Sequence, residues 1–328
     1  MLIKACPHTE EMKLVAALLT VYVVWGSTYL AIAVADRSLP PLLMLSVRFL
    51  VAGAVLFAWK RQRPTLRQWV AAAAVGGALL VVDTGGVALA EQRVASGIAA
   101  LLVATVPLFV ALLDRACFGI RLPLGAALGI VVGLVGVVLL VGGSGRVDPV
   151  GVVVLIVASF AWAAGSTYAR VAPLPADTVL SAAMQMLTAG AVLGVLGAAS
   201  GERFHAVSAS ALGALGFLVV FGSLLAFTAY GWLLQNAPSP VVSTYAYVNP
   251  AVAVGLGWLF VGEHVGPREV IAGLVILSSV ALLAIRHERR VAPEPVAEAL
   301  APYIRRQEAK ISEFRGAPRL HELPRMAA

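Results

Sequence analysis

The sequence predicts an all-α membrane protein with about ten transmembrane helices, and three observations support this prediction. Hydrophobic residues make up 60% of the 328 residues and charged residues only 12%, unlike the composition of a soluble globular domain. The apolar residues come in runs of about 18 to 25, and a helix rising ~1.5 Å per residue crosses a ~30 Å hydrocarbon core over such a length. Short loops between the runs hold nearly all of the charge.

The apolar runs define the predicted helices in chain order. The first run is followed by Asp36, Arg37 and a pair of prolines and not by a small-residue cleavage pattern, so we expect a retained helix. After the last run the composition shifts to a charged segment, which we expect to be a tail outside the membrane. The predicted spans are Leu14–Ala35, Pro41–Trp59, Trp69–Ala90, Ser96–Leu113, Leu122–Val141, Val150–Ala169, Thr178–Ala199, Ala209–Leu234, Val241–Val261 and Val270–Ile285.

The distribution of Lys and Arg predicts the orientation of these spans, because cytoplasmic loops collect positive charge. It places the N- and C-termini in the cytoplasm, and the formal net charge of +7 then gives no reason to expect a nucleic-acid partner. Cys6 and Cys117 fall on the cytoplasmic side, where a disulfide is not expected. The inner segments contain Lys4, Lys13, Lys60, Arg61, Arg63, Arg67, Arg115, Arg121, Arg170, Arg286, Arg289 and Arg290, whereas the outer loops contain Arg37, Arg93, Arg146, Arg203 and Arg268.

The chain contains an internal duplication. The tetrapeptide GSTY begins at Gly26 and again at Gly165, and RFLVAG at Arg48 corresponds to QMLTAG at Gln185. The stretch 96–119 matches 239–262 with identical spacing of its Ser, Pro and Gly positions. Each copy contains about five spans, and an odd number makes the second copy enter the membrane from the opposite side. The sequence therefore predicts two inverted five-helix repeats.

The duplication divides the chain into four predicted segments. Residues 1–13 are a cytoplasmic N-terminus, 14–142 the first repeat, 149–285 the second repeat and 286–328 a cytoplasmic basic tail. Inverted repeats create a pseudo-two-fold axis in the membrane plane. Rocking of one half against the other would then expose a central site to each side in turn, which predicts alternating access.

Two charged residues, Arg48 and Asp83, lie inside the spans and away from their ends. Charges in such places are costly and are therefore functional candidates. Both lie about 8 residues, or ~12 Å, from the outer ends of their spans, and Thr28 lies in the same layer. An ion pair between Arg48 and Asp83 is one hypothesis, and a structural role, substrate binding and proton coupling all stay open for these residues.

The second repeat lacks these charges, because Gln185 replaces the arginine and Ala226 falls opposite Asp83. Aromatic side chains accumulate instead, and they predict a cavity for an apolar or aromatic solute, or for a cation attracted by the rings. The alternative is that the rings serve packing or anchor the protein at the membrane interface. The candidate cavity residues are Trp25, Thr28, Tyr29, Arg48, Asp83, Trp162, Tyr168, Gln185, Tyr230, Tyr245 and Asn249.

Prolines interrupt two corresponding spans, Pro107 in the fourth and Pro250 in the ninth. Each proline removes a backbone hydrogen bond and is expected to kink its helix, and such breaks commonly line a cavity. Asn249 directly precedes Pro250 and shares a helix face with Tyr245. We therefore expect both interrupted spans to border the central site.

These motifs resemble the EamA-type transporters of the drug/metabolite transporter superfamily. The resemblance extends over most of the chain and includes WGSTYLAI; it is strongest in LLVATVPLF and YAYVNPAVA and in the pair Gly262–Glu263. It implies an inner-membrane, multi-pass carrier that is built from two repeats and exports an amino acid or another metabolite. Many relatives have an acidic residue in the first repeat at the position corresponding to Glu263, whereas this chain has Ile120 there.

The predicted function is secondary transport of a small metabolite, either an amino acid or a drug-like or aromatic solute. Export is the first expectation and proton coupling stays open; facilitated uptake and a membrane-embedded scaffold or sensor are the alternatives. An enzyme is not expected, because every histidine lies in a loop or tail and no catalytic motif is present. No cofactor or metal is expected, and the expected partners are the solute and the lipid bilayer, with a homodimer as a further alternative.

Overall fold

The computed structural model describes residues 7–60, 62–119, 124–141, 148–237, 239–242, 244–262 and 266–288. Over these ranges the regular structure is helical and no β-strand is present, which confirms the all-α prediction. The chain divides into two units, residues 1–285 and 286–328, and the described helices belong to the first unit apart from residues 286–288. The rest of the predicted tail lies outside the described residues, as does Glu263.

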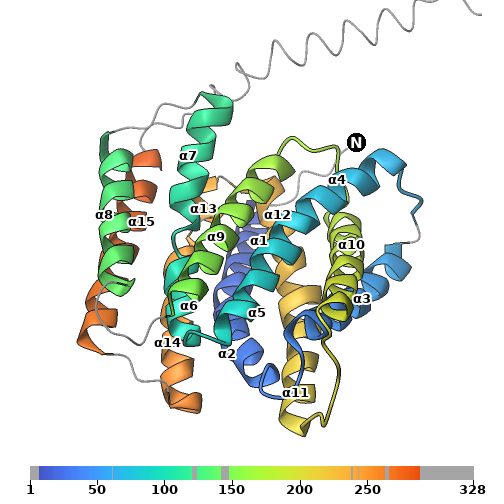
Figure 1. Ribbon diagram of the computed structural model, residues 1–328. Coiled ribbons are helices and arrows are strands. Elements are labelled where there is room, and N and C mark those ends of the chain that lie inside the picture. Colours follow the sequence, from blue (N-terminus) through green and yellow to red (C-terminus); the bar gives the residue numbers. More distant parts are fainter. Residues whose placement is uncertain are drawn as a thin grey trace, which may run out of the picture. The chain divides into compact units, whose positions relative to one another are not determined.

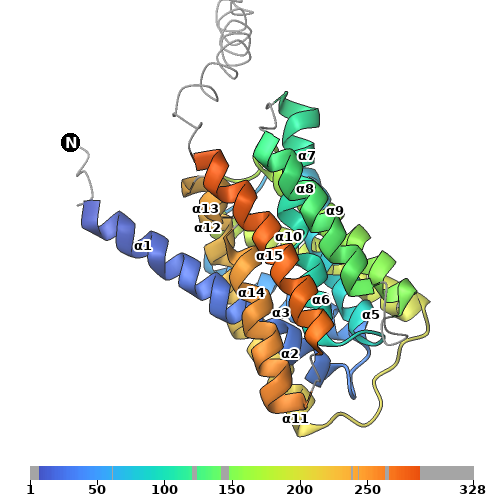
Figure 2. The same ribbon diagram turned by 90° about the vertical axis from the view of Figure 1, so that its left-hand side faces the viewer.

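The first half of the chain begins with a long helix that contains a π-helical turn. This helix consists of α1 (Pro7–Thr20), η1 (Val21–Trp25) and α2 (Gly26–Ala35), and Figure 2 shows α1 extending away from its neighbours. A second long helix, residues 66–91, also has a π-helical segment at its centre. The remaining elements of this half are α3 (Pro41–Lys60), α4 (Leu66–Gly76), η2 (Gly77–Thr84), α5 (Gly85–Glu91), α6 (Ser96–Val103), α7 (Val106–Phe118) and α8 (Leu124–Val141) (Figure 1).

The second half repeats the pattern of a long helix with a central π-helical segment, here at residues 209–236. Its π-helical segment falls at the position that corresponds to η2 when the halves are aligned at Ser96 and Ser239. The elements of this half are α9 (Pro149–Ala169), α10 (Thr178–Ala199), α11 (Ala209–Phe217), η3 (Leu218–Phe227), α12 (Thr228–Asn236), α13 (Ser239–Val242), α14 (Tyr245–Leu256), η4 (Gly257–Val261) and α15 (Pro267–Glu288).

Seven described helices are long and apolar enough to cross a membrane. Shorter apolar helices cover Val248–Val261 and Val270–Ser279. The total of about ten spans and the side on which each terminus lies stay predictions. The seven long helices are Glu11–Ala35, Pro41–Lys60, Leu66–Glu91, Ser96–Phe118, Pro149–Ala169, Thr178–Ala199 and Ala209–Asn236.

Several of these helices have a capping side chain at their N-terminus. Thr65 and Gln68 form a capping box at the start of α4, in which the Thr65 hydroxyl accepts from the Gln68 backbone N–H. At the starts of α9, α10 and α11 the side chains of Asp148, Asp177 and Ser208 accept hydrogen bonds from backbone N–H groups of the first turn. Because these caps satisfy backbone N–H groups at helix ends, the boundaries of the long helices are set locally.

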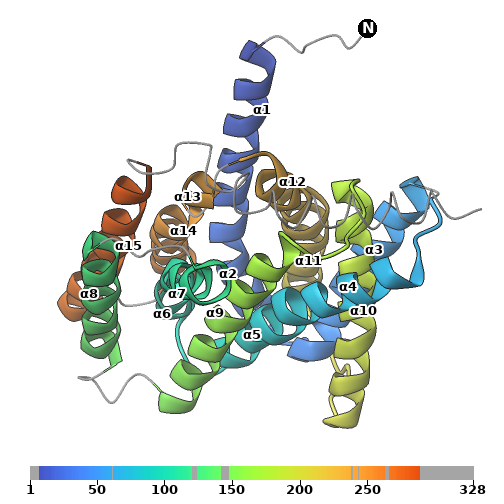
Figure 3. The ribbon, with the colours of Figure 1, turned by 90° about the horizontal axis from the view of Figure 1, so that it is seen from above.

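Helices α3 and α10 pack side by side and join the two halves (Figures 1 and 3). At one end Lys60 Nζ lies 2.7 Å from Asp177 Oδ2. At the other end the Glu202 carboxylate accepts hydrogen bonds from the backbone N–H groups of Leu42 and Leu43, at 3.2 and 2.9 Å. The two helices are therefore antiparallel, which is the course that an inverted repeat requires of corresponding segments.

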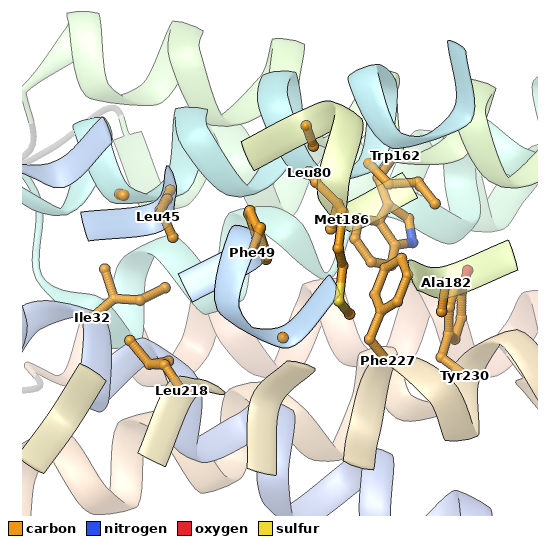
Figure 4. Close-up of a cluster of buried hydrophobic side chains, with 14 of the residues drawn as sticks. Ile32, Leu45, Phe49, Leu80, Trp162, Ala182, Met186, Leu218, Phe227 and Tyr230 are labelled. Carbon is orange, nitrogen blue, oxygen red and sulfur yellow. The ribbon is translucent and has the colours of Figure 1, made fainter. Parts of the chain in front are cut away.

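The core of the bundle is filled by side chains from both halves (Figure 4). Leu45 and Phe49 of α3 and Met186 of α10 are almost completely buried, as is Leu218 at the start of η3. Their close packing leaves little freedom for α3 to slide against α10. The aromatic candidates Trp162 and Tyr230 belong to the same core.

The outer helices expose apolar side chains, as expected of helices in contact with lipid. On α8, Leu128, Val131, Val135 and Val138 recur at helical spacing and are at least half exposed. The opposite side of α8 approaches α15 closely, since a Cβ atom added at Gly136 would lie 2.7 Å from Ile276 Cγ1. An apolar outer surface and a close inner contact are typical of a membrane-spanning helix.

Candidate functional site

A cavity of about 70 Å³ lies between helices of both halves. Its walls come from η1, α2, α3, η2, α5 and α6 of the first half and from α9, η3 and α14 of the second. Eight of the residues that the sequence singled out line it: Trp25, Thr28, Tyr29, Arg48, Asp83, Trp162, Tyr245 and Asn249. The residues that the sequence analysis missed are Ile32, Phe49, Leu80, Thr84, Val87, Val103, Gly222, Ser223 and Phe227.

Arg48 and Asp83 both line this cavity and both are 5% exposed, but they do not pair with each other. Arg48 Nε donates a hydrogen bond to Ser223 Oγ at 2.8 Å, whereas its Nη1 is buried without a partner. Asp83 Oδ1 is likewise buried without a partner. The ion pair suggested by the sequence is thus not formed, and the side-chain partner of Arg48 is Ser223 of the other half.

Three π-helical segments contribute side chains to the cavity. Trp25 ends η1, Asp83 lies near the end of η2, and Gly222 and Ser223 lie at the centre of η3. The wider π-turn shifts the side chains that follow it relative to an α-helix, and such turns are frequent at functional sites. Arg48, in contrast, projects from the middle of a regular α-helix.

The repeated tetrapeptide GSTY has a packing role in both halves. A Cβ atom at Gly26 would lie 2.6 Å from Val252 Cβ of α14, and one at Gly165 would lie 2.8 Å from Ala78 Cβ of η2. Only glycine allows these helices to approach so closely. Thr28 after the first glycine and Ser166 and Thr167 after the second are buried in the bundle, and Thr28 lines the cavity.

Four aromatic rings form a cluster at one wall of the cavity. The ring centroid of Trp25 lies 5.3 Å from that of Trp162, 4.9 Å from that of Tyr230 and 5.7 Å from that of Tyr245. Tyr230 also lies 5.4 Å from Trp162, and its hydroxyl is 2.9 Å from Ser166 Oγ. The rings expected to surround an open hollow instead pack against one another.

Two further cavities lie beyond this cluster. One of about 470 Å³ is lined by Arg170, Gln185, Tyr230 and Gln235, and a smaller one of about 30 Å³ extends from Trp162 and Tyr245 to Arg170. The rings of Trp162 and Tyr245 line both the small cavity and the cavity around Arg48. The aromatic cluster thus separates the Arg48 cavity from a larger space toward Arg170.

The other predicted site residues have different positions. Gln185 lines the larger cavity and donates to Ser181 Oγ at 3.0 Å, so it does not meet Arg48. Tyr168 is 43% exposed and lines none of these three cavities. Tyr230 does not line the Arg48 cavity and is connected to it by its contacts with the other rings of the aromatic cluster.

The two prolines lie in different helical contexts. Pro107 is in the first turn of α7, where the chain has already left α6 at Val103, so the fourth span is interrupted just before the proline. Pro250 lies inside α14.

Asn249 precedes Pro250 and makes contacts of its own. When its side-chain amide is oriented to satisfy both contacts, the Asn249 nitrogen donates to the carbonyl oxygens of Tyr22 and Tyr245 at 3.1 and 3.2 Å. Asn249 therefore connects the interrupted helix to η1.

Gly222 and Ser223 carried a weak signal in the sequence. They form a small polar pair within the apolar run LVVFGSLLAF, but Gly and Ser are common in transmembrane helices and usually serve helix packing. Within the described part of the chain no group of three or more His, Cys, Asp or Glu side chains could hold a metal ion.

The chain matches the EamA-like transporter family over residues 12–142 and 149–285. It is 41% identical over 283 residues to the uncharacterized inner membrane transporter YedA of Escherichia coli (strain K12), covering 84% of this chain and 92% of that protein. It is 28% identical over 268 residues to the protein PecM of Dickeya dadantii (strain 3937), covering 79% of this chain and 88% of PecM.

A solved crystal structure of a protein shares the fold, with a TM-score of 0.63 and 22% identity over 84% of this chain and 98% of that one. The family match extends over both halves, and the identity to the E. coli relative extends over most of both chains. The chain therefore belongs to the EamA-like transporter family, and it is a multi-pass inner-membrane transporter of a small solute.

Proposed function

We propose that the protein is a secondary transporter that exports a small zwitterionic solute, such as an amino acid with an apolar or aromatic side chain. One observation supports this solute chemistry above all. Arg48 and Asp83 line one cavity, and each has a buried polar atom without a partner: Nη1 and Oδ1. The cavity thus presents one cationic donor and one anionic acceptor.

Unpaired polar atoms of this kind favour a bound solute. A buried donor or acceptor without a partner costs about 1–3 kcal/mol, and a charged group costs more. A carboxylate would accept from Arg48, and an ammonium group would donate to Asp83. The aromatic and aliphatic walls would then surround the apolar part of the solute.

The size of the cavity indicates an incompletely open site. Its volume of about 70 Å³ is less than half of the ~150 Å³ that encloses benzene in an engineered cavity. A head group fits in this space, and a larger side chain needs the aromatic cluster to separate. The larger cavity beyond the cluster lies near Arg170, on the side that the distribution of Lys and Arg assigns to the cytoplasm. A cytoplasmic approach of this kind supports export.

Alternating access between two inverted repeats is the proposed mechanism. We assign residues 14–142 and 149–285 to the two repeats, each with about five spans, and both termini to the cytoplasm. The antiparallel course of α3 and α10 and the matching positions of η2 and η3 support this assignment. Asp83, buried in the first repeat, is the candidate for proton coupling.

A counterflow assay with three matched probes tests the solute chemistry. Proteoliposomes loaded with unlabelled L-phenylalanine should accumulate the labelled compound. Phenethylamine lacks the carboxylate and 3-phenylpropionate lacks the ammonium group, so each should compete about 10- to 100-fold more weakly than L-phenylalanine. Equal competition by all three probes, or no counterflow, would contradict the zwitterion proposal. Thr188→Val changes a hydroxyl on α10 that lines none of these cavities and serves as the control.

Proton coupling and direction need separate measurements. Asp83→Asn should lose accumulation driven by a pH gradient even at a phenylalanine concentration high enough to restore its weakened counterflow, and unchanged driven accumulation would rule out coupling through Asp83. Cells that overproduce the protein should tolerate higher concentrations of toxic phenylalanine analogues if it exports them. Increased sensitivity would indicate uptake instead.

A further inference from the structure

The residues that hold the guanidinium group of Arg48 lie on the opposite half of the protein. We propose that Gly222 and Ser223 of η3 determine the charge preference of the site by holding Arg48 so that its Nη1 stays free for an anionic group of the solute. This inference rests on the proposed function, since it concerns how the same site selects its solute. It gives η3 a role that neither the family match nor the sequence pattern assigns.

Ser223 fixes one edge of the guanidinium group. Its side chain is fully buried, and its Oγ accepts the hydrogen bond from Arg48 Nε at 2.8 Å. A hydrogen bond from a cationic donor is stronger than a neutral one, and burial removes competition from water. Because the N–H groups of a guanidinium are arranged in one rigid plane, fixing Nε also limits where Nη1 can lie.

Gly222 leaves space for the Nη2 edge of the Arg48 guanidinium group. A Cβ atom at this position would lie 2.8 Å from Arg48 Nη2 and 3.2 Å from Thr28 Cγ2. Any side chain at residue 222 would therefore occupy the place of the guanidinium group. The Gly222 carbonyl oxygen also accepts a hydrogen bond from Trp25 Nε1 at 3.3 Å. Two adjacent residues of one half thus contact three cavity residues of the other half.

This arrangement leaves Arg48 and Asp83 as two separate groups that line one buried cavity. A direct pair would neutralise both. The bond to Ser223 leaves Nη1 and Asp83 Oδ1 each without a protein partner. The site is therefore preorganised for the two charges of a solute, and less conformational entropy is lost when the solute binds.

Loss of either residue should therefore change selectivity more than folding. In Ser223→Ala the guanidinium loses the hydrogen bond that fixes its Nε, so Nη1 is no longer held in one place. In Gly222→Ala the added methyl group displaces the end of a flexible side chain and no backbone atom, so the helices need not move. Both variants should lose the preference for a carboxylate, whereas Ser223→Thr keeps the hydroxyl and should keep the preference.

The test compares the apparent affinities for L-phenylalanine and phenethylamine in proteoliposomes. Their ratio should fall at least fivefold in Ser223→Ala and Gly222→Ala, with the affinity for phenethylamine nearly unchanged. Ser46→Ala is the matched control, because Ser46 also bonds across the halves, to the Gly190 carbonyl oxygen at 2.8 Å, but lines none of these cavities. An equal loss of affinity for both probes in Ser223→Ala would show a merely structural role and overturn the inference, while the proposed function would stand.

A measurement without any solute separates the two proposals. The Arg48 Nε–H signal in ¹⁵N-arginine NMR, assigned by its loss in Arg48→Lys, should shift in Ser223→Ala and stay in place in Ser46→Ala. A signal that is the same in the wild type and Ser223→Ala would overturn the role of Ser223. If the wild-type protein carries none of the probes, the proposed zwitterion transport fails, and this NMR comparison still decides whether Ser223 holds Arg48.

Discussion

The carboxyl group of Asp36 lies just beyond α2 and has both oxygens buried without a partner. Burial raises the pKa of Asp36, and the negative charge of Glu202 raises it further, to about 8. Glu202 itself is fixed by the backbone N–H groups at the start of α3. Near neutral pH Asp36 is therefore mostly protonated, although it lies in a loop at the end of a span.

This pKa predicts how stability depends on pH. Between pH ~4 and pH ~8 the folded protein keeps a proton on Asp36 that the unfolded chain has lost, so its contribution to stability is complete below pH ~4 and declines as the pH rises through the window. Melting temperatures in detergent should show a weaker decline from pH 5 to pH 8 for Asp36→Asn than for the wild type.

Asp148→Asn is the control for this measurement. Backbone hydrogen bonds from Gly151 and Val150, together with Arg93, lower the pKa of Asp148. Its contribution is therefore lost as the pH falls below ~4 and does not change between pH 5 and pH 8. A pH profile of Asp36→Asn that coincides with that of the wild type would contradict the role of Asp36.

At the residue scale, the sequence identified charges and rings but not their partners. Arg48, Asp83 and Trp25 stand out because charged and large polar-tipped side chains are rare in apolar runs. Ser223 and Gly222 do not stand out, since their importance arises only when the second half packs against the first. The Arg48–Asp83 ion pair was suggested for a related reason. The depth of each residue along its helix was predictable from the sequence, but the side-chain partner of Arg48, the Ser223 hydroxyl, was not.

At the scale of elements, hydropathy located the spans, while local chemistry set their ends. The third span was expected from Trp69, but α4 begins at Leu66 because Thr65 and Gln68 form a capping box. That signal was readable from the sequence. The π-helical segments η2 and η3 were not, because a π-turn changes the hydrogen-bond register and leaves the apolar composition unchanged.

The start of α10 allows a cap and an ion pair to be measured separately. Asp177 Oδ1 accepts from the N–H groups of Val179 and Leu180, and Oδ2 pairs with Lys60. Asp177→Ala removes both interactions and should lower the free energy of unfolding by about 1–2 kcal/mol, whereas Asp177→Asn keeps the cap and should cost less than about 1 kcal/mol. Unfolding in detergent by heat or denaturant measures the difference.

Lys60→Gln provides the matching control, since it removes the ion pair and leaves the cap intact. Its effect should equal that of Asp177→Asn. An Asp177→Asn variant as unstable as Asp177→Ala would show that the ion pair, and not the cap, holds this helix end.

At the scale of the whole molecule, the all-helical architecture and the family were predictable because composition and repeated motifs are properties of the entire chain. The separation of the Arg48 cavity from the larger cavity by aromatic rings was not, because it depends on contacts among η1, α9, α12 and α14. The spacing of residues along one helix predicts which of them share a face, but it does not predict how rings from four helices pack together.

The predicted orientation can be tested by labelling with a membrane-impermeant maleimide. In a background with Cys6→Ser and Cys117→Ser, the exposed position Arg203→Cys should react in intact spheroplasts. Arg67→Cys, also exposed but at the start of α4, should react only after the membrane is permeabilised. Reaction of both positions in intact spheroplasts would overturn the inverted topology.

The contact between α3 and α10 is closed at both ends by side chains that bridge the two halves, Lys60 with Asp177 and Glu202 with the start of α3. The two copies therefore contact each other through side chains of their helices as well as through the loop that links them. We expect separate chains, each with one copy, to associate through the same contact. A single duplicated and fused gene is then a way of fixing the one-to-one ratio of its parts.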